Sequence, residues 1–503
     1  MISLLSFLDA DSFLQFLRSE AIRPILYVAT EYLLRFGMVL VVLVRKASRP
    51  SVATGWIVLV LAQPVIGAIL YFTVGEIRFG RHRIRRHREI LARIDTPAIH
   101  RHSNPLAYAP QLSEAARELA LLSDSVSHGI VCGGNRVELF SRTEETIDAM
   151  IAAIDAAERH CHGLFYIWLD DATGRRMAEA FSRASARGVA CRVLVDAVGS
   201  KGFLRSETCR AMRASGVRVV AGLPVNLVRM VLSRIDLRNH RKILVVDGTI
   251  GFTGSQNIAD ASFAPKAKYA PWVDCMIRLD GPAVRELQMI FVVDWLLDAP
   301  DRGSDLDVET VLAIEPAVHP DGVPAQVLAT GPNYQGDAVT QIVQALVHTS
   351  RRELVLTTPY FLPDQATLTN LTVAARRGVD VTLVVPARND NRLVGLASRS
   401  LFGPLLDAGV HIEEFHGGLL HAKTITVDGS IGVVMSANLD LRSYELNFEC
   451  GVLVYDEAFT KRLRALQQSY RARSTPAPAD RWRNRPLRVK LAQGAASVLS
   501  PLL

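Results

Sequence analysis

Patterns for metal binding, disulfide bonding and serine hydrolysis are missing from this chain of 503 residues. Its six cysteines are scattered and include no CxxC pair, which argues against a zinc site and a disulfide framework. No GxSxG stretch occurs, so a serine hydrolase is a poor fit. The first residues lack a basic region and carry Asp9 and Asp11, so a cleaved signal peptide is not expected. We therefore expect reduced thiols, in or facing a cytoplasm.

Charge is absent from one long stretch. Residues 51–75 read SVATGWIVLVLAQPVIGAILYFTVG, which is 25 positions without Asp, Glu, Lys or Arg. That length crosses a bilayer as a helix, and membrane helices tolerate a kink at a residue such as Pro64. A buried core helix is the alternative. We expect a spanning helix at about 53–75.

A weaker candidate precedes it at about 24–44. It contains Glu31 and Arg35, whose i,i+4 spacing lets them pair on one helix face. Two spans form a helical hairpin. One span with an interfacial first helix is the alternative.

A basic stretch follows the apolar one and completes a membrane region over residues 1–100. Residues 76–93 contain seven arginines, more than the short loop between the two candidate spans. The positive-inside rule then places the rest of the chain in the cytoplasm, as a multi-pass membrane protein. The arginines could hold anionic lipid or form a solvated helix face. The net charge of +7 suits anionic surfaces, and the apolar span favours lipid over nucleic acid.

One polar constellation occurs twice, 181 positions apart. Residues 240–257 read HRKILVVDGTIGFTGSQN and residues 421–438 read HAKTITVDGSIGVVMSAN, with nine of eighteen identical. The repeated polar pairs are His240/His421, Lys242/Lys423, Asp247/Asp428, Ser255/Ser436 and Asn257/Asn438. Two similar hairpins with incidental polar residues are the alternative, but packing alone would need only the apolar identities. The repeat predicts two copies of one unit, each giving half of a site.

The repeat extends over whole domains that alternate strand-like and helix-like segments, which predicts an α/β fold. We expect domains over 110–310 and 320–473, joined near 301–325, and a basic, apolar tail over 474–503. In the first domain strands are expected at 164–169 and 192–195, and helices at 141–159 and 176–187. In the second domain a helix is expected at 338–348, and strands at 354–357 and 381–385. Residues 474–480 look like a linker, and the rest of the tail could lie on a membrane or be loosely docked or disordered.

The repeated residues suit phosphoryl chemistry. Side chains alternate along a strand, so His240 and Lys242 point the same way, as do His421 and Lys423. Two histidines, two lysines and two asparagines around one axis form a pocket for a tetrahedral anion. One neutral histidine can attack phosphorus while the other, protonated, supplies a proton to the leaving oxygen. The lysines provide the positive charge, so no metal or other cofactor is expected.

At this point the residues resemble a known family. The spacing HxK(x)4D(x)6GSxN of the first copy is similar to the phospholipase D superfamily motif, and two intact copies are highly specific. Further stretches resemble bacterial cardiolipin synthases over essentially the whole chain, among them FYIWLDD, WVDCMIRLDGPAV, TPYFLPD and ANLDLRSYELNFE. The resemblance implies two tandem α–β–α sandwich domains related by pseudo-twofold symmetry, with the active site between them.

The resemblance also implies an activity and roles for residues. Two phosphatidylglycerol molecules, one donor and one acceptor, would give cardiolipin and glycerol through a phosphatidyl-histidine intermediate. His240 would be the nucleophile and His421 the acid/base, although the reverse is possible. Lys242, Lys423, Asn257 and Asn438 would bind phosphate, and Ser255 and Ser436 would hydrogen-bond within the site. An acidic residue downstream of each histidine, Asp274 and Glu449, would orient its ring, whereas Asp247 and Asp428 fit better as turn residues within the motifs.

Two departures from the family pattern and two alternatives to a cardiolipin synthase remain. Met435 stands where the first copy has Gly254, so tight packing near Ser436 is in question. In addition, residues 259–271 read ADASFAPKAKYAP, where many members of the family have a Gly and an acidic pair. Another phospholipase D-type chemistry, such as phospholipid hydrolysis, transfer to a different alcohol or nucleic-acid cleavage, would use the same residues. A catalytically dead lipid-binding scaffold is the third reading. The donor preference, the attacking histidine and the oligomeric state stay open.

Overall fold

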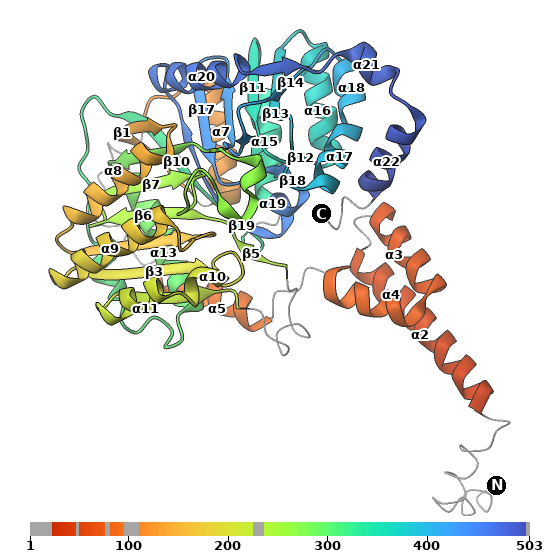
Figure 1. Ribbon diagram of the computed structural model, residues 1–503, viewed down its shortest axis with the longest axis horizontal. Coiled ribbons are helices and arrows are strands. Elements are labelled where there is room, and N and C mark those ends of the chain that lie inside the picture. The colour runs from red at the N-terminus through yellow and green to blue at the C-terminus, as the bar shows by residue number, and fades with distance from the viewer. Residues whose placement is uncertain are drawn as a thin grey trace, which may run out of the picture. The chain divides into compact units, whose positions relative to one another are not determined.

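The computed structural model describes residues 23–46, 50–75, 81–94, 110–127, 129–224, 236–334 and 337–498. Its elements fall into two units, each described here by itself (Figure 1). The first contains the helices up to residue 75, and the second contains every element from residue 81 onward.

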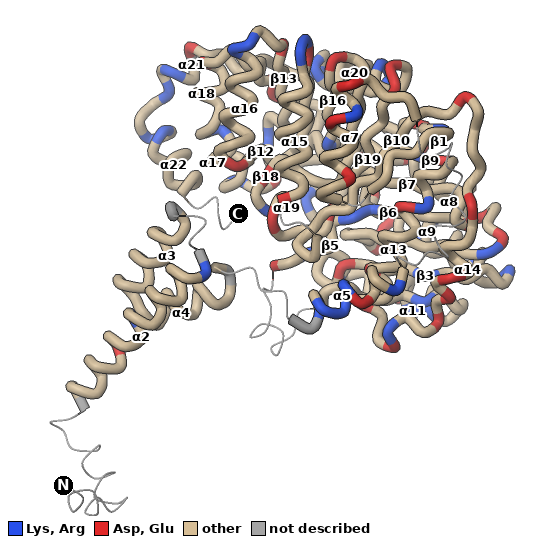
Figure 2. The backbone as a smooth tube through the Cα atoms, turned by 180° about the vertical axis from the view of Figure 1, so that it is seen from behind, with Lys and Arg blue, Asp and Glu red and all other residues tan. Residues whose placement is uncertain are grey.

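The first unit begins with helix α2 (Arg23–Lys46). Its stretch Pro24–Arg45 is long and apolar enough to cross a membrane, and only 11% of its most apolar window is buried. Glu31 and Arg35 form an ion pair of 2.7 Å along this helix, as the i,i+4 spacing predicts. Figure 2 shows few charged residues on this unit.

The expected single helix over 53–75 is instead interrupted. Helix α3 (Pro50–Ala62) is followed by α4 (Pro64–Leu70) and a π-helical turn, η1 (Tyr71–Gly75). Gln63 leaves the helical conformation, with φ −141° and ψ 84°, because proline disfavours helical backbone in the residue before it. The helices still pack as a hairpin, around a core formed by Met38, Val42, Ala53, Val60, Ala68 and Tyr71.

The second unit contains one continuous sheet of 16 strands, to which both predicted domains contribute half. In pairing order the first half contains β1 (Val131–Phe140), β9 (Met276–Asp280), β7 (Ile250–Gly254), β6 (Lys242–Val246), β2 (His160–Phe165), β3 (Ala190–Asp196) and β4 (Arg218–Gly222). The second half contains β10 (Val323–Thr330), β19 (Asn447–Val454), β17 (Ile431–Met435), β16 (Thr424–Val427), β11 (Glu353–Thr357), β13 (Asp380–Pro386) and β14 (His411–Phe415). The two halves repeat one topology and join where β1 and β10 pair antiparallel.

Helices cover both faces of this sheet, so each half is an α–β–α sandwich (Figure 1). One face carries α13 (Val284–Asp298) from the first half and α20 (Glu457–Arg471) from the second. The opposite face carries α8 (Thr143–Asp155), α9 (Ala172–Ala186) and α11 (Glu207–Ala214), and then α7 (Glu114–Ser127), α15 (Ala338–Thr349), α16 (Gln365–Arg376) and α18 (Phe402–Asp407). The boundaries 110–310 and 320–473 stay a prediction, because the shared sheet leaves no contact break between the halves.

A buried ion pair braces the two halves. Arg241 has no exposed surface, and it donates to Asp294 on α13 at 2.7 Å. The same guanidinium donates to the carbonyl oxygens of Glu449 and Thr330, on strands of the second half, at 3.1 and 3.0 Å. Arg241 therefore links α13 of the first half to two strands of the second half.

Part of the basic stretch packs within the second unit, whereas the sequence analysis expected it to bind anionic lipid or to form a solvated helix face. Its helix α5 (Arg81–Ile94) packs on α13 through Ile90 and Ile94. Arg83 pairs with Asp298 at 2.5 Å, and Arg86 donates to the carbonyl oxygen of Leu296. Only part of the arginine cluster therefore remains exposed, notably at positions 85, 88 and 93.

The strand expected at 164–169 ends earlier, because β2 stops at Phe165. The backbone N–H groups that follow are bound by side chains instead of a neighbouring strand. Ile167 donates to Asn257 Oδ1 at 3.2 Å and Trp168 donates to Ser200 Oγ at 2.9 Å. The remaining expected strands and helices are present, with ends that differ by a few residues.

The tail is ordered up to residue 498, and the predicted linker contains a strand. β20 (Ser474–Pro476) pairs antiparallel with β14 and covers what would be an open sheet edge. After α21 (Ala479–Arg483), helix α22 (Leu487–Val498) packs on α17 (Arg392–Ser400), with Ala496 buried beside Val394 and Ala397. Within this part of the chain the loosely docked reading is wrong.

The buried pair of Arg241 and Asp294 predicts a large effect on stability. Asp294→Asn should lower the free energy of unfolding by about 3–5 kcal/mol, because it leaves a fully buried guanidinium without its counter-charge. Chemical denaturation of the full chain in detergent measures this. Asp148→Asn, which removes an exposed pair with Arg176, is the control and should change stability by less than about 1 kcal/mol. Equal effects of the two variants would contradict the role of the buried pair.

Candidate active site

Both copies of the repeated motif reach one cleft at the boundary between the halves. His240 and His421 lie immediately before β6 and β16, and both line a cavity of about 510 Å³. Asn257 and Asn438 line the same cavity. Residues that are 181 positions apart in sequence therefore share one site.

Each histidine is held by a carboxylate from the opposite half. His240 Nδ1 lies 3.0 Å from Glu449 Oε2, and His421 Nδ1 lies 2.6 Å from Asp274 Oδ1. The sequence analysis identified both acidic residues, but it paired each with the histidine upstream of it in the same half. The pairing is crossed in the structure.

Strand pairing between the halves explains the crossing. The short strand β5 (Arg238–Asn239) runs parallel to β19 of the second half, and the His240 N–H donates to the Phe448 carbonyl at 2.9 Å. In the same way β15 (Leu419–Leu420) pairs with β8 (Trp272–Val273), and the His421 N–H donates to the Val273 carbonyl at 2.8 Å. Each histidine is thereby laid beside the carboxylate strand of the other half.

The two serines fix the carboxylates. Ser255 Oγ donates to Asp274 Oδ1 at 2.6 Å, and Ser436 Oγ donates to Glu449 Oε2 at 2.5 Å. Each hydroxyl also accepts from the backbone N–H that follows its carboxylate residue, at 2.9 Å in both halves. The serines therefore act on the carboxylates that orient the histidines.

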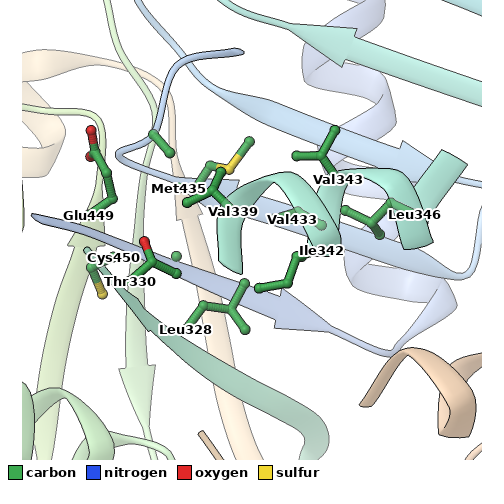
Figure 3. Close-up of a pocket in the computed structure, with 12 residues that line it drawn as sticks. Leu328, Thr330, Val339, Ile342, Val343, Leu346, Val433, Met435, Glu449 and Cys450 are labelled. Atoms are coloured by element: carbon green, nitrogen blue, oxygen red, sulfur yellow. The ribbon is translucent and has the colours of Figure 1, made fainter. Parts of the chain in front are cut away.

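Met435 does not disturb this arrangement. Its side chain lines a small cavity of about 20 Å³ between α15 and strands β10, β17 and β19, beside Val339 (Figure 3). Gly451 makes room for it, since a Cβ there would lie 2.8 Å from the Met435 Cβ. Glu449 lies at the edge of the same cavity, and its bond to Ser436 is intact.

Both lysines are fully buried beside the histidines. Lys242 Nζ donates to the His240 carbonyl at 2.5 Å, and Lys423 Nζ donates to the His421 carbonyl at 2.6 Å. Burial lowers the pKa of Lys242 to about 7 and that of Lys423 to about 8, and the charge of Lys423 adds to the lowering at Lys242. Two such cations in a closed site favour the entry of an anion.

Burial disfavours the protonated form of both histidines. Burial lowers the pKa of His240 to about 4, against the opposing attraction of Glu449, and it lowers that of His421 as well. For the carboxylates burial acts in the opposite direction but is outweighed. The paired histidine, by attraction and by its hydrogen bond, and then a neighbouring lysine lower the pKa of Glu449 to about 2 and also lower that of Asp274.

The asparagines differ between the halves. Asn257 Oδ1 accepts from the Ile167 N–H at 3.2 Å, whereas the buried Asn438 Oδ1 has no hydrogen-bond partner in the described part of the chain. An atom of this kind, facing a polar cleft, is ready to meet a ligand.

Asp247 and Asp428 lie in the β6–β7 and β16–β17 turns and do not line the cleft. Asp247 accepts from the backbone N–H groups of residues 158, 159 and 160 at 2.8–2.9 Å. Asp428 accepts from those of residues 351, 352 and 353 at 2.7–2.9 Å. Both adopt positive φ, 52° and 51°, so they hold their turns rather than touch a ligand.

Several residues of the cleft were not singled out in the sequence. The Tyr166 ring lies 4.8 Å from the His240 ring, and the Trp272 ring lies 4.6 Å from the His421 ring. Asn447 Nδ2 donates to Glu449 Oε1 at 3.1 Å. Strand alternation could have found Asn447, which is two residues before Glu449, just as Arg238 is two residues before His240. No local sequence pattern identifies Tyr166 or Trp272 as residues of the cleft.

The segment 259–271, noted as a departure, forms one side of the cleft. Phe263 stacks on Trp272 with ring centres 3.9 Å apart. Lys266 pairs with Asp390 of the second half, and Asp390 also accepts from the Tyr360 hydroxyl at 2.7 Å. Among the described residues no group of three or more His, Cys, Asp and Glu side chains is placed to hold a metal ion.

Comparison with known proteins agrees with this geometry. The family described as "Cardiolipin synthase, PLD-like domain" matches residues 150–295 and 342–470, and "Phospholipase_D-nuclease N-terminal" matches residues 37–76. The chain is 36% identical to cardiolipin synthase A of Edwardsiella ictaluri (strain 93-146), over 94% of this chain and 97% of that protein. It is equally identical to cardiolipin synthase A of Yersinia pseudotuberculosis serotype O:1b (strain IP 31758), with the same shares covered.

Among solved structures, the phosphatidylserine synthase of Haemophilus influenzae Rd KW20 shares the fold. It matches with a TM-score of 0.58 and 14% identity, over 78% of this chain and 100% of that chain. The family match spans both halves of the sheet, and the curated relatives extend over nearly the whole length. The chain belongs to the cardiolipin synthase family of phospholipase D-like proteins.

Proposed function

We propose that the protein is a cardiolipin synthase that transfers a phosphatidyl group from one phosphatidylglycerol to another and releases glycerol. The observation that carries this is the pair of crossed histidine–carboxylate contacts, with two buried lysines, around one cleft. Such a site offers a nucleophile, an acid/base and positive charge to one phosphodiester. Membership of the family supports the choice of substrate.

The first step forms a covalent intermediate. His240 Nε2 attacks phosphorus while Glu449 holds the proton on Nδ1, so that the attacking nitrogen is the unprotonated one. The P–O bond to the donor's glycerol breaks, and His421 gives its Nε2 proton to that oxygen. Lys242, Lys423, Asn257 and Asn438 bind the phosphoryl oxygens.

The second step reverses the roles. His421, now neutral, takes the proton from a hydroxyl of the acceptor phosphatidylglycerol. That oxygen forms the new P–O bond, and the P–N bond to His240 breaks. Protons and electron pairs balance over the two steps, and both histidines return to their starting states.

The charges of the site control when His421 carries its proton. Its pKa is lowered by burial and by Lys423, so the empty site disfavours the imidazolium. A bound phosphodiester brings a negative charge, which favours protonation of a nearby histidine. Binding of the substrate therefore favours the protonated His421 that the first step requires.

Transfer in place of hydrolysis requires that water be kept from the intermediate. Aromatic and aliphatic side chains on one side of the cleft, including Leu169, Phe263 and Trp272, provide an apolar wall. Lipid entering along such a wall displaces water from the reacting atoms.

We further propose that the enzyme resides in a bacterial inner membrane as a multi-pass protein, with its catalytic unit on the cytoplasmic side and anionic lipids as partners. The apolar helix α2, the α3–α4 segment and the arginines after residue 76 support this. The six cysteines are unpaired, which suits a reducing compartment.

Helix α22 supports contact between the catalytic unit and the membrane surface. Its buried residues Gln493 and Ala496 lie on the face that packs on α17. At 100° per residue, the exposed Leu487, Leu491 and Val498 lie on the opposite face. Arg488 and Lys490 flank that apolar stripe on its two sides, the pattern of an interfacial helix.

Product analysis tests the proposed reaction. The purified chain in mixed micelles of detergent and phosphatidylglycerol should form cardiolipin and glycerol in equal amounts. His240→Ala and His421→Ala should each lower the rate by at least about 1,000-fold, because each removes a group used in both steps. Leu121→Ala, at an exposed position on α7, is the control and should retain full activity.

The outcomes separate the candidate functions. Phosphatidic acid as the dominant product would replace the transferase with a hydrolase that uses the same residues. No turnover of phosphatidylglycerol by the wild type, with or without phosphatidylethanolamine, would sink the proposal and favour a lipid-binding scaffold.

Anion binding should be accompanied by proton uptake. At pH 8 the buried Lys242 is mostly neutral, since its pKa is about 7, and a bound oxyanion raises that pKa. Tungstate affinity should therefore fall as the pH rises from 7 to 9. Calorimetry in buffers of different ionisation enthalpy measures the uptake directly, and Lys242→Met should reduce it. A binding heat that is independent of the buffer would contradict the prediction.

The α22 stripe predicts a dependence on the lipid surface. Leu491→Glu should slow cardiolipin formation in phosphatidylglycerol vesicles by roughly tenfold, because a half-exposed leucine no longer enters the interface. With short-chain phosphatidylglycerol in detergent the rate should be unchanged. Leu121→Glu is a matched control, since both leucines are 65% exposed. Equal losses for the two variants would exclude α22 as a membrane contact.

A further inference from the structure

The two walls of the cleft occupy equivalent positions in the repeat but differ in chemistry. On one wall β5 pairs with β19, which places Arg238 beside Asn447. On the other, β15 pairs with β8, which places Leu419, a buried residue outside the cleft lining, beside the cleft residue Trp272. Arg238 and Leu419 are 181 positions apart, like the two histidines, and Asn447 and Trp272 each lie two residues before a histidine-binding carboxylate. The catalytic residues thus follow the pseudo-twofold repeat, whereas the residues around them are polar on one side and apolar on the other.

The polar wall contains two arginines that have no counterpart in the repeat. Arg238 shares the strand face of His240 because it lies two residues before it. Arg442 comes from α19 (Leu441–Glu445) of the second half, and the position 181 residues before it is Ala261. Both arginines line the cleft.

Tyr166 connects the arginine pair with the catalytic centre. Its ring contacts the His240 ring. Burial raises the pKa of the Tyr166 phenol, and the charges of Arg238 and Arg442 both oppose that rise. The two guanidinium groups, one from each half, therefore act on one spot next to the reacting histidine.

Asn447 adds a hydrogen-bond acceptor to this wall. It is 7% exposed and its Nδ2 donates to Glu449 Oε1, which fixes the amide with Oδ1 turned away from Glu449. That oxygen has no hydrogen-bond partner among the described residues. A buried acceptor that lines a cleft needs a donor from a ligand, and a hydroxyl group fits.

The reaction demands a second anion site. If the proposed function holds, the phosphate of the donor occupies the centre formed by the histidines, lysines and asparagines. The acceptor lipid brings a phosphate of its own, joined to the attacking hydroxyl by only one glycerol unit. Two phosphates so close together repel each other, so the second needs cations in the same cleft. Its glycerol also carries a second hydroxyl.

We propose that Arg238, Arg442 and Asn447 form a subsite for the acceptor headgroup, in which the arginines bind its phosphate and the Asn447 oxygen accepts from its free hydroxyl. Arginine suits this task because its planar donors match phosphate oxygens. The opposite wall, which Phe263 and Trp272 line, is mainly aromatic and offers fewer cations to a second phosphate. Lys266, the cation on that side, is engaged by Asp390.

The carboxylates near Arg238 and Arg442 do not prevent the two arginines from binding a phosphate. Burial raises the pKa of Asp440 to about 6 and raises that of Asp196, while Arg442 and Arg238 respectively oppose these rises. Each arginine thus already balances one carboxylate of its own half. A phosphate that binds between the two guanidinium groups adds the charge that both can share.

The test separates the two steps of the reaction. The full chain, reconstituted with phosphatidylglycerol labelled in its headgroup glycerol, is assayed for released glycerol and for cardiolipin. Wild type should give one glycerol for each cardiolipin. In Arg238→Gln and Arg442→Gln the KM for the acceptor should rise about tenfold or more, and the ratio of cardiolipin to glycerol should fall below one as water replaces the acceptor.

Three further variants test whether the effect has another cause. Arg238→Lys and Arg442→Lys keep the charge and should restore part of the ratio, which a purely structural role would not predict. Arg205→Gln changes an exposed arginine outside the cleft and should behave as wild type. Thermal unfolding of each variant shows whether it is folded.

The results have distinct meanings. An unchanged ratio and acceptor KM in both Gln variants would overturn the subsite. Parallel loss of glycerol release and cardiolipin in folded variants would also overturn it, since the arginines would then serve the donor step. A wild type that releases no glycerol would instead overturn the proposed function itself.

Discussion

The crossed contacts between each histidine and the carboxylate of the opposite half are the constraint on which the site depends. Neither half contains a complete histidine–carboxylate pair, so the site exists only when β5 lies on β19 and β15 lies on β8. The continuous sheet and the buried Arg241 hold the halves in that register. The site is therefore complete only when both halves are folded against each other.

Burial supplies the chemistry that this assembly makes possible. Ammonium and imidazole groups that are closed off from water lose affinity for protons, whereas the surrounding cations keep the carboxylates ionised. A bound phosphate therefore favours the protonated forms that burial disfavours. The same burial gives a reason for the serines, which do not line the cleft: they donate to carboxylate oxygens that water cannot reach.

Most of the α/β architecture could be predicted, because apolar periodicity and the internal repeat are local signals. The errors occurred where a tertiary contact replaced a local one. Side chains bind the N–H groups after β2 and end the strand, and an open sheet edge recruits residues 474–476. Arg83 and Arg86 look like surface charge in the sequence, but both bind residues of α13. Local sequence could not reveal these contacts, because the partners are more than 200 residues away.

The sequence by itself determined the chemistry: two copies of histidine, lysine, serine and asparagine at strand spacing, with an apolar segment ahead of them. Those features are set by side-chain type and by a period of a few residues. Only the tertiary structure decided which carboxylate meets which histidine, and that Arg238 meets Asn447 on one wall while Leu419 meets Trp272 on the other. Pairing between distant strands depends on how whole faces pack, and no local pattern encodes it.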